Sequence, residues 1–277
     1  MKAPFYLLLG KKSPMKITLY LPILFVLIYA CTKVPISGRK QMHLLPEASL
    51  IEMSNEEYAS FLNNSQVLNY GPQVDQVKSV GAKLKKATEA FLKKEGAMDR
   101  IAGFTWEFNV VESPELNAWC MPGGKICFYT GILEITENEA GTAVVMGHEI
   151  AHAVARHGNE RMSKATMVEL GGTALNIAVA EQSEQARALM MSAYGVGANL
   201  GLMLPFSRKH ELEADMMGLV LMQLAGYDAH VATAFWERMS AAGGEVPEFL
   251  STHPSGQTRI QEIKSFLNSD QFYRLTH

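Results

Sequence analysis

The chain has 277 residues, enough for one large domain or two small ones. Hydrophobic residues make up 48% of the chain and charged residues 19%, so a sizeable core is expected. The net charge of −3 and the lack of a long basic run exclude a surface for nucleic acid. Three cysteines are too few for a disulfide scaffold.

The N-terminal segment, residues 1–31, is expected to be a targeting signal rather than part of the fold. Residues 17–30 carry no charge and are too few to cross a bilayer comfortably. They end at Cys31 in a sequence similar to a bacterial lipobox, which predicts that Cys31 is lipidated. An uncleaved signal anchor is the alternative, and Met15 is an alternative start. Residues 32–277 are then expected to form a single domain outside the cytoplasm.

Hydrophobic periodicity along the rest of the chain predicts helices that flank a small central sheet, which is an α+β fold. The predicted strands are residues 104–112, 116–121 and 125–131, and a hairpin turn joins the last two. The predicted helices are residues 46–64, 73–96, 137–157, 159–180, 183–195, 208–224, 230–241 and 257–267.

The predicted hairpin carries two cysteines. A two-residue turn at Gly123 and Gly124 would place Cys120 opposite Cys127. Opposed cross-strand β-carbons lie about 4.5–5.5 Å apart, and an oxidising compartment permits a disulfide between them. Two buried free thiols are the alternative.

The stretch AVVMGHEIAHAVARHG, residues 143–158, places two histidines and a glutamate inside an apolar run. On a helix His148 and His152 point the same way, so both can bind one metal ion. Glu149 lies about 100° round from His148, where it can take a proton from metal-bound water. This is the H-E-x-x-H motif of zinc peptidases. A helix with two hydrogen-bonded core histidines is the alternative.

A catalytic zinc site needs three protein ligands and a water, and the stretch SRKHELEAD offers the third ligand. Glu211 and Asp215 are again four residues apart on a predicted helix, so Glu211 can bind the metal while Asp215 orients a ligand histidine. His210 is a rival ligand, and Glu213 is expected to point to solvent. On its own this stretch also fits an ordinary charged helix face.

Residues 188–206 contain no charge and are long enough for a transmembrane helix. A single span here would put His152 and Glu211 on opposite sides of a membrane, where they could not share a metal ion. We therefore expect buried core or a mobile flap, with a re-entrant hairpin as the alternative.

Three spaced motifs, HEIAH, SRKHELEAD and STHPSGQTRI, resemble the M48 family of zinc metalloendopeptidases. The hairpin stretch NAWCMPGGKICFYTGIL is similar to the element that precedes the family's active-site helix. The stretch CTKVPISGRKQ is similar to the start of bacterial lipoprotein members, which include outer-membrane quality-control proteases. The resemblance covers about residues 34–266, and Cys120 and Cys127 depart from the aliphatic residues expected there.

The resemblance implies a mainly helical zincin domain of the gluzincin type, with a small antiparallel sheet beside the active-site helix and one zinc ion per chain. It implies that His148, His152 and Glu211 bind the metal. Glu149 would then be the general base and Asp215 the partner of a ligand histidine.

Other roles follow from the resemblance alone. His253, in STHP, would stabilise the oxyanion, although a histidine before proline can also be purely structural. Arg208 and Arg259 would brace the site by ion pairing, and His157 is expected to be structural. The strand around Asn117 and Ala118 would hold an extended peptide by strand addition.

The resulting hypothesis is a zinc metalloendopeptidase that is lipid-anchored in the cell envelope, on the periplasmic face of the outer membrane. It would degrade misfolded or unassembled envelope proteins and work with assembly or chaperone partners. The alternatives are a chaperone-like envelope lipoprotein with little proteolytic activity and a zinc hydrolase that acts on other bonds.

Overall fold

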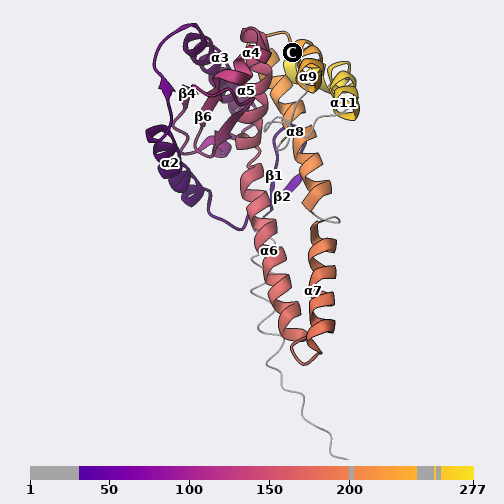
Figure 1. Cartoon of the computed structure of the whole chain (residues 1–277). Helices are drawn as coiled ribbons and strands as arrows, with labels where there is room; N and C mark the ends of the chain where they lie inside the picture. Colours follow the sequence, from indigo (N-terminus) through magenta and orange to yellow (C-terminus); the bar gives the residue numbers. More distant parts are fainter. Residues whose placement is uncertain (1–30, 200–202, 242–252, 254–256) are drawn as a thin grey trace, which may run out of the picture.

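The computed structural model describes residues 31–199, 203–241, 253 and 257–277 (Figure 1). The predicted signal segment up to residue 30 lies outside the described residues. Cys31 opens strand β1 (Cys31–Lys33), which pairs antiparallel with β2 (Lys40–Met42). None of the helices in the described part is long and apolar enough to cross a membrane.

The helices surround a small sheet, as expected for an α+β fold. Two long helices and a short 3₁₀ turn η2 precede the last three strands: α2 (Glu47–Asn63), α3 (Pro72–Lys94) and η2 (Met98–Ile101). The later helices are α4 (Thr130–Thr136), α5 (Glu139–Val154), α6 (His157–Ala178), α7 (Glu184–Ala198), α8 (Leu204–Leu224), α9 (Val231–Ala241), α11 (Gln257–Leu267) and α12 (Asp270–Thr276).

The sheet has the strand order β3-β4-β6-β5, with β3 (Val67–Leu68), β4 (Glu107–Val111), β5 (Ala118–Met121) and β6 (Lys125–Tyr129). The β5–β6 hairpin is antiparallel, as predicted, whereas β4 and β6 run parallel. Parallel pairing arises because the chain leaves β4, forms the edge strand β5 and then turns back beside β4. The mainly helical fold with a small sheet is confirmed, and the sheet is mixed rather than wholly antiparallel.

The hairpin register differs from the predicted one. Met121 pairs with Lys125, so the loop contains three residues, and both of its glycines have positive φ. Cys120 therefore lies opposite Ile126, and Cys127 lies opposite Trp119. Successive residues face opposite sides of a sheet, so the two thiols point apart and both cysteines are free. The predicted disulfide is wrong.

The helix predicted over residues 137–157 is shorter in the structure, because a residue in the left-handed region lies just beyond each end of α5. Glu137 (φ 64°) separates α4 from α5, and Arg156 (φ 55°) separates α5 from α6. Asn138 caps α5, because its side chain accepts a hydrogen bond from the backbone amide of Gly141 at 3.1 Å. The turn at Arg156 ends α5 directly after the H-E-x-x-H segment.

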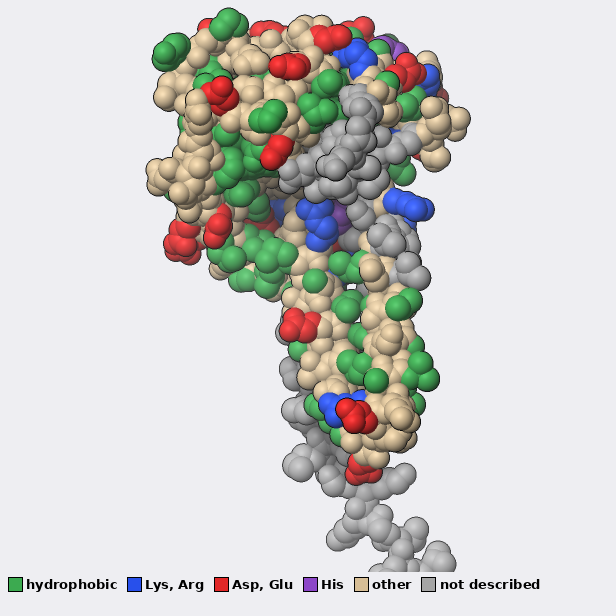
Figure 2. All heavy atoms as spheres, viewed as in Figure 1, with side chains coloured by type: hydrophobic (Ala, Val, Ile, Leu, Met, Phe, Trp, Pro, Cys, Tyr) green, Lys and Arg blue, Asp and Glu red, His purple; other side chains and the backbone are tan. Residues whose placement is uncertain are grey.

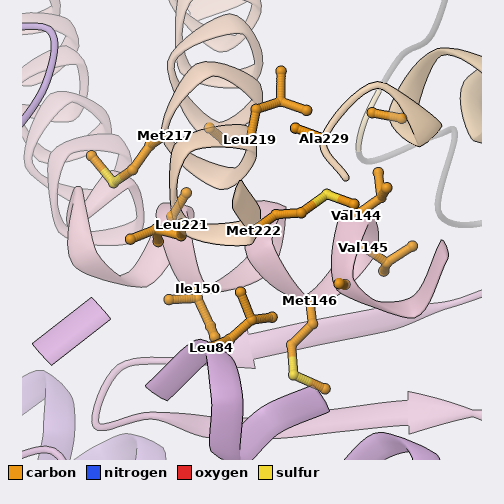
Figure 3. Packing of buried hydrophobic residues seen from close by; sticks show 14 of the residues in the cluster. Leu84, Val144, Val145, Met146, Ile150, Met217, Leu219, Leu221, Met222 and Ala229 are labelled. Carbon is orange, nitrogen blue, oxygen red and sulfur yellow. The ribbon is translucent and has the colours of Figure 1, made fainter. Parts of the chain in front are cut away.

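Helix α5 forms the centre of the core, between α3 and α8 (Figure 3). Met146 and Ile150 of α5 face Leu84 of α3, while Met217 and Leu221 of α8 cover another side. Fully burying a side chain of this kind contributes about 1.5–3 kcal/mol. Every residue of α5 from Gly141 to Val154 is buried, so any polar group on this helix lies in the interior.

Helices α5 and α8 cross with their backbones in contact. A β-carbon on Gly218 would lie 2.8 Å from the carbonyl carbon of Gly147 and from the amide nitrogen of His148. A β-carbon on Gly147 would lie 2.9 Å from the carbonyl oxygen of Gly218. The crossing therefore requires glycine on both helices.

Helices α6 and α7 leave the body side by side as a helical hairpin, which we call the arm (Figure 1). The hydroxyl of Tyr194 on α7 donates to the carbonyl of Val168 on α6 at 2.8 Å. Helix α7 contains no buried residue, and Leu189 is 72% exposed. The expectation that the uncharged stretch at residues 188–206 forms buried core is therefore wrong for its part in α7.

Gly218→Ala is expected to destabilise the protein, because the methyl group forces α5 and α8 apart. Overpacking of this kind costs about 1–3 kcal/mol and outweighs the helix-propensity gain of about 1 kcal/mol. Urea unfolding measures the change. Gly195→Ala in α7 is the matched control, since a β-carbon there meets nothing within 4 Å, and it should be neutral or stabilising. Equal stability of the two variants would contradict the close crossing.

Candidate metal centre

Two helices and one loop bring four potential metal ligands together. His148 and His152 lie on α5, Glu211 lies on α8, and His253 lies in the segment before α11. One potential ligand atom from each residue lies within 4.8 Å of those of the other three. The three residues predicted as ligands from their spacing thus converge, and His253 joins them.

Glu211 has its two carboxylate oxygens directed at the two helix α5 histidines. Its Oε2 lies 3.4 Å from Nε2 of His148, and its Oε1 lies 3.4 Å from Nε2 of His152. Burial opposes the charge, but hydrogen bonds from His148 and His253 keep the pKa of Glu211 far below its usual value. Glu211 is therefore a carboxylate at neutral pH, as a metal ligand must be.

Asp215 fixes the orientation of His148. Its Oδ1 lies 2.9 Å from Nδ1 of His148 and accepts a hydrogen bond from it. The other ring nitrogen, Nε2, is therefore directed at the remaining potential ligands. Arg259 donates to both carboxylate oxygens of Asp215, at 2.6 and 2.7 Å. The guanidinium of Arg259 also lies over the ring of Trp236, 3.6 Å from its centroid. The predicted bracing by Arg259 and the predicted contact of Asp215 with a ligand histidine are both present.

A chain of hydrogen bonds through His157 fixes the orientation of His152. Nε2 of His157 lies 2.9 Å from Oε2 of Glu213, and a carboxylate only accepts, so His157 carries its proton on Nε2. Burial, opposed by the bond to Glu213, lowers the pKa of His157 to about 4, so the ring is neutral and its Nδ1 accepts. That Nδ1 lies 2.9 Å from Nδ1 of His152, which must then donate. The lone pair of His152 is left on Nε2.

The hydrogen bonds that Asp215 makes to His148 and that His157 makes to His152 make the site suitable for a cation. Nε2 of His148 and Nε2 of His152 lie 3.1 Å apart, and the Glu211 carboxylate faces both. Lone pairs and a carboxylate in mutual contact repel one another unless a positive charge lies among them. Although burial opposes it, hydrogen bonds to Asp215 and Glu211 raise the pKa of His148 to about 9, so a proton on Nε2 is one way to supply this positive charge and a metal ion in its place is another. Two imidazole nitrogens and a carboxylate fit zinc.

Glu149 is buried beside the ligand group and is not part of it. Its side chain is only 4% exposed, and its Oε1 lies 3.6 Å from Nε2 of His253. Burial raises the pKa of Glu149 above its usual value, although His253 and His148 act against this. A carboxylate with a raised pKa can take up a proton and release it again at neutral pH.

His253 contacts two of the predicted metal ligands directly, which its predicted role as an oxyanion donor does not require. Its Nδ1 lies 2.8 Å from Oε2 of Glu211 and 3.1 Å from Nε2 of His148. Its backbone carbonyl accepts a hydrogen bond from Arg259 at 3.2 Å. This position suits either a fourth ligand or a donor beside the metal, so its role as oxyanion donor stays a prediction.

A buried polar network behind the site was missed by the sequence reasoning. Glu213 is 7% exposed and forms an ion pair with Arg39 at 2.7 Å, so the expectation that it points to solvent is wrong. Arg39 also pairs with Glu160 at 2.8 Å. His210 lies 3.1 Å from Glu160 and stacks on His157, so this rival ligand belongs to the network.

Two further expectations can be compared with the structure. Arg208 is exposed on α8 and is absent from the ion pairs found among the described residues, so bracing falls to Arg259. His157 is buried, as a structural residue would be, but it also contacts a ligand. No local pattern signalled Arg39, because its partner Glu213 is 174 residues away in sequence.

The strand predicted to hold a peptide lies at the edge of the sheet. No described strand pairs with the outer side of β5, and β5 packs against α5. The carbonyl of Asn117 accepts from the amide of Tyr129 on β6, so in an antiparallel ladder the backbone groups of Ala118 and Cys120 face outward. This edge can accept another extended strand.

Two imidazoles, a carboxylate and an adjacent buried glutamate on an H-E-x-x-H helix define the class of zinc-dependent peptidases. The sequence model of peptidase family M48 matches residues 77–267, most of the chain. The chain belongs to this family and is a zinc metalloendopeptidase.

Named relatives agree with the family. Mitochondrial metalloendopeptidase OMA1 of Schizosaccharomyces pombe is 34% identical over 253 residues, which is 88% of this chain and 68% of that protein. OMA1 of Arabidopsis thaliana is 40% identical over 177 residues, 64% of this chain and 34% of that protein. The beta-barrel assembly-enhancing protease of Escherichia coli K12 is 27% identical over 169 residues, 59% of this chain and 34% of that protein.

His157→Phe is expected to weaken zinc binding by roughly 10–100-fold, the usual effect of losing a partner of a ligand histidine. The phenyl ring keeps the stacking on His210 but cannot accept the proton from His152. Competition with a chromophoric chelator measures the zinc affinity. His210→Gln is the control, since its partner is Glu160, and its affinity should change little. Equal losses in both variants would mean that the network acts only through general stability.

Proposed function

We propose that the chain hydrolyses peptide bonds in proteins at a membrane surface, with His148, His152 and Glu211 as the zinc ligands. The observation that carries this assignment is the convergence of three buried lone-pair donors on one point. The mitochondrial relatives are named metalloendopeptidases, and the Escherichia coli relative is named for assembly of beta-barrels. Removal of misfolded or unassembled envelope proteins is the cellular function that we propose.

The mechanism depends on proton transfer at Glu149. Zinc, when bound, polarises the substrate carbonyl and lowers the pKa of a coordinated water to about 7. Glu149 accepts the proton of the attacking water and delivers it to the leaving amine. Asp215 keeps the proton of His148 on Nδ1 throughout. The outer edge of β5 at Ala118 holds the substrate backbone in extended form, with Asn117 at its start, which allows broad specificity.

The location of the protein is part of the proposal. An uncharged stretch at residues 17–30 and the lipobox-like end at Cys31 support a signal peptide followed by a lipid anchor. This would hold the single domain at residues 32–277 at the periplasmic face of the outer membrane of a cell envelope, where assembly or chaperone partners work. Mass spectrometry of the membrane-extracted protein tests it: an intact N-terminus would contradict cleavage and lipidation at Cys31.

Glu149→Gln is expected to lower casein hydrolysis by at least about 100-fold, because the amide cannot take up a proton. The zinc content should equal that of the wild type, since Glu149 is not a ligand. Hydrolysis and metal content are measured on both purified chains. If both chains bind zinc and neither cleaves casein, a chaperone-like protein with little proteolytic activity becomes the better hypothesis.

His253→Ala is expected to lower kcat by about 100-fold with unchanged KM and zinc content, because a donor to the oxyanion is lost. His253→Gln keeps a donor and should restore part of the rate. Steady-state kinetics on a fluorogenic peptide distinguishes these cases. A variant more active than the wild type would show instead that His253 acts as a fourth ligand that excludes water from the metal.

A further inference from the structure

The arm carries an unusual share of the exposed apolar side chains. Among the described residues, seven large hydrophobic side chains on α6 and α7 are more than 40% exposed: Met162, Met167, Leu170, Ile177, Leu189, Met190 and Val196. Figure 2 shows hydrophobic side chains along both helices of the arm. A monomeric soluble protein rarely exposes such a contiguous group without a binding partner.

Charged side chains mark the two ends of the arm. Between residues 165 and 180 the only charge is Glu169, and residues 188–199 carry none. Charged side chains of both signs, Glu181, Glu184 and Arg187, lie at the turn between α6 and α7 and in the first turn of α7, and all three are exposed. A charged tip is costly to place in the hydrocarbon core of a bilayer, so the arm is not built to enter a membrane tip first.

Basic side chains surround the base of the arm, and we call them the collar. They come from four elements, which are the paired strands β1 and β2, the first turns of α6 and the first half of α8: Lys33, Lys40, Arg161, Lys164, Arg208 and Lys209. Burial, with nearby Arg39 and Lys209, lowers the pKa of Lys164 to about 8, although Glu160 acts against this. Figure 2 shows Lys and Arg side chains where the arm meets the body. The collar is complementary to anionic headgroups.

The N-terminal segment joins the described chain at the same place. Cys31 lies in β1, β1 pairs with β2, and β2 packs on α6. The backbone amide of Leu44, just after β2, donates to the hydroxyl of Ser163 on α6 at 2.9 Å. Cys31, where the described part of the chain begins, therefore lies in the hairpin that contributes Lys33 and Lys40 to the collar.

From these features we propose that the arm is a membrane-binding element that lies in the interface of a bilayer containing anionic lipids. The apolar side chains of α6 and α7 enter the boundary between headgroups and acyl chains, and the collar binds the headgroups. The charged tip stays at headgroup level, where the polar side chains of interfacial helices lie. This agrees with the finding that no described helix is long and apolar enough to span a membrane. The proposal does not depend on peptidase activity.

A fluorescent probe on the full chain tests the proposal. Leu189→Cys, in α7, is labelled with the environment-sensitive fluorophore NBD, and the chain is added to vesicles of phosphatidylcholine and phosphatidylglycerol. The emission is expected to shift to shorter wavelength and to be quenched by nitroxides on the lipid acyl chains. Tyr273→Cys is the matched control, because Tyr273 is 64% exposed on α12, away from the arm, and its label should not respond. The labelled unmodified chain gives the background of the native cysteines.

Three results would overturn the proposal. The label at position 189 could stay in water although the chain sediments with the vesicles. Its emission could shift without vesicles and increase with protein concentration, which would mean that a second copy covers the arm. An equal shift on phosphatidylcholine alone would remove the role of the collar. Casein hydrolysis in the same samples is a separate result, so failure of the arm and failure of the peptidase can be distinguished.

Discussion

The contact between α5 and α8 at Gly147 and Gly218 is the constraint on which the site depends. His148 follows Gly147 directly, and Asp215 lies almost one turn before Gly218, so backbone contact brings their side chains to hydrogen-bonding distance. A side chain at either glycine would separate the helices by more than a hydrogen bond can bridge. Glu211, the predicted ligand from α8, lies one turn before Asp215 on the same helix and reaches both histidines for the same reason.

Burying so many polar groups is stable only because each ligand histidine has a charged support behind it. On one side His148 bonds Asp215, which two nitrogens of Arg259 hold. On the other side His152 bonds His157, then Glu213, then Arg39. Removing one member of such a buried pair costs several kcal/mol, on the order of 3–5. The two arginines come from opposite ends of the chain, so the metal centre depends on the packing of both ends.

Whether the sequence predicted an interaction depends on how far apart its two residues lie along the chain. The pairs His148–His152 and Glu211–Asp215 are four residues apart on helices, so their shared direction is a local property that the sequence carries. Glu213 was misassigned because its burial depends on Arg39, far away in the chain. The predicted hairpin register was wrong because both glycines of the loop take positive φ and the loop is one residue longer than predicted. The parallel pairing of β4 with β6 likewise leaves no local pattern.

The helices of the arm adjoin those of the metal centre in the chain, which links the place where the protein is held to the place where it acts. Helix α6 begins at His157, which contacts a ligand, and α7 leads into α8, which carries Glu211 (Figure 1). The α6 root of the arm is thus tied to the site through the buried hydrogen bond between His157 and His152, and buried, paired contacts resist displacement. A surface bound along the arm therefore fixes the direction of the site relative to that surface. The edge strand β5, packed on α5, is oriented with it, so a substrate would be presented from a constant side.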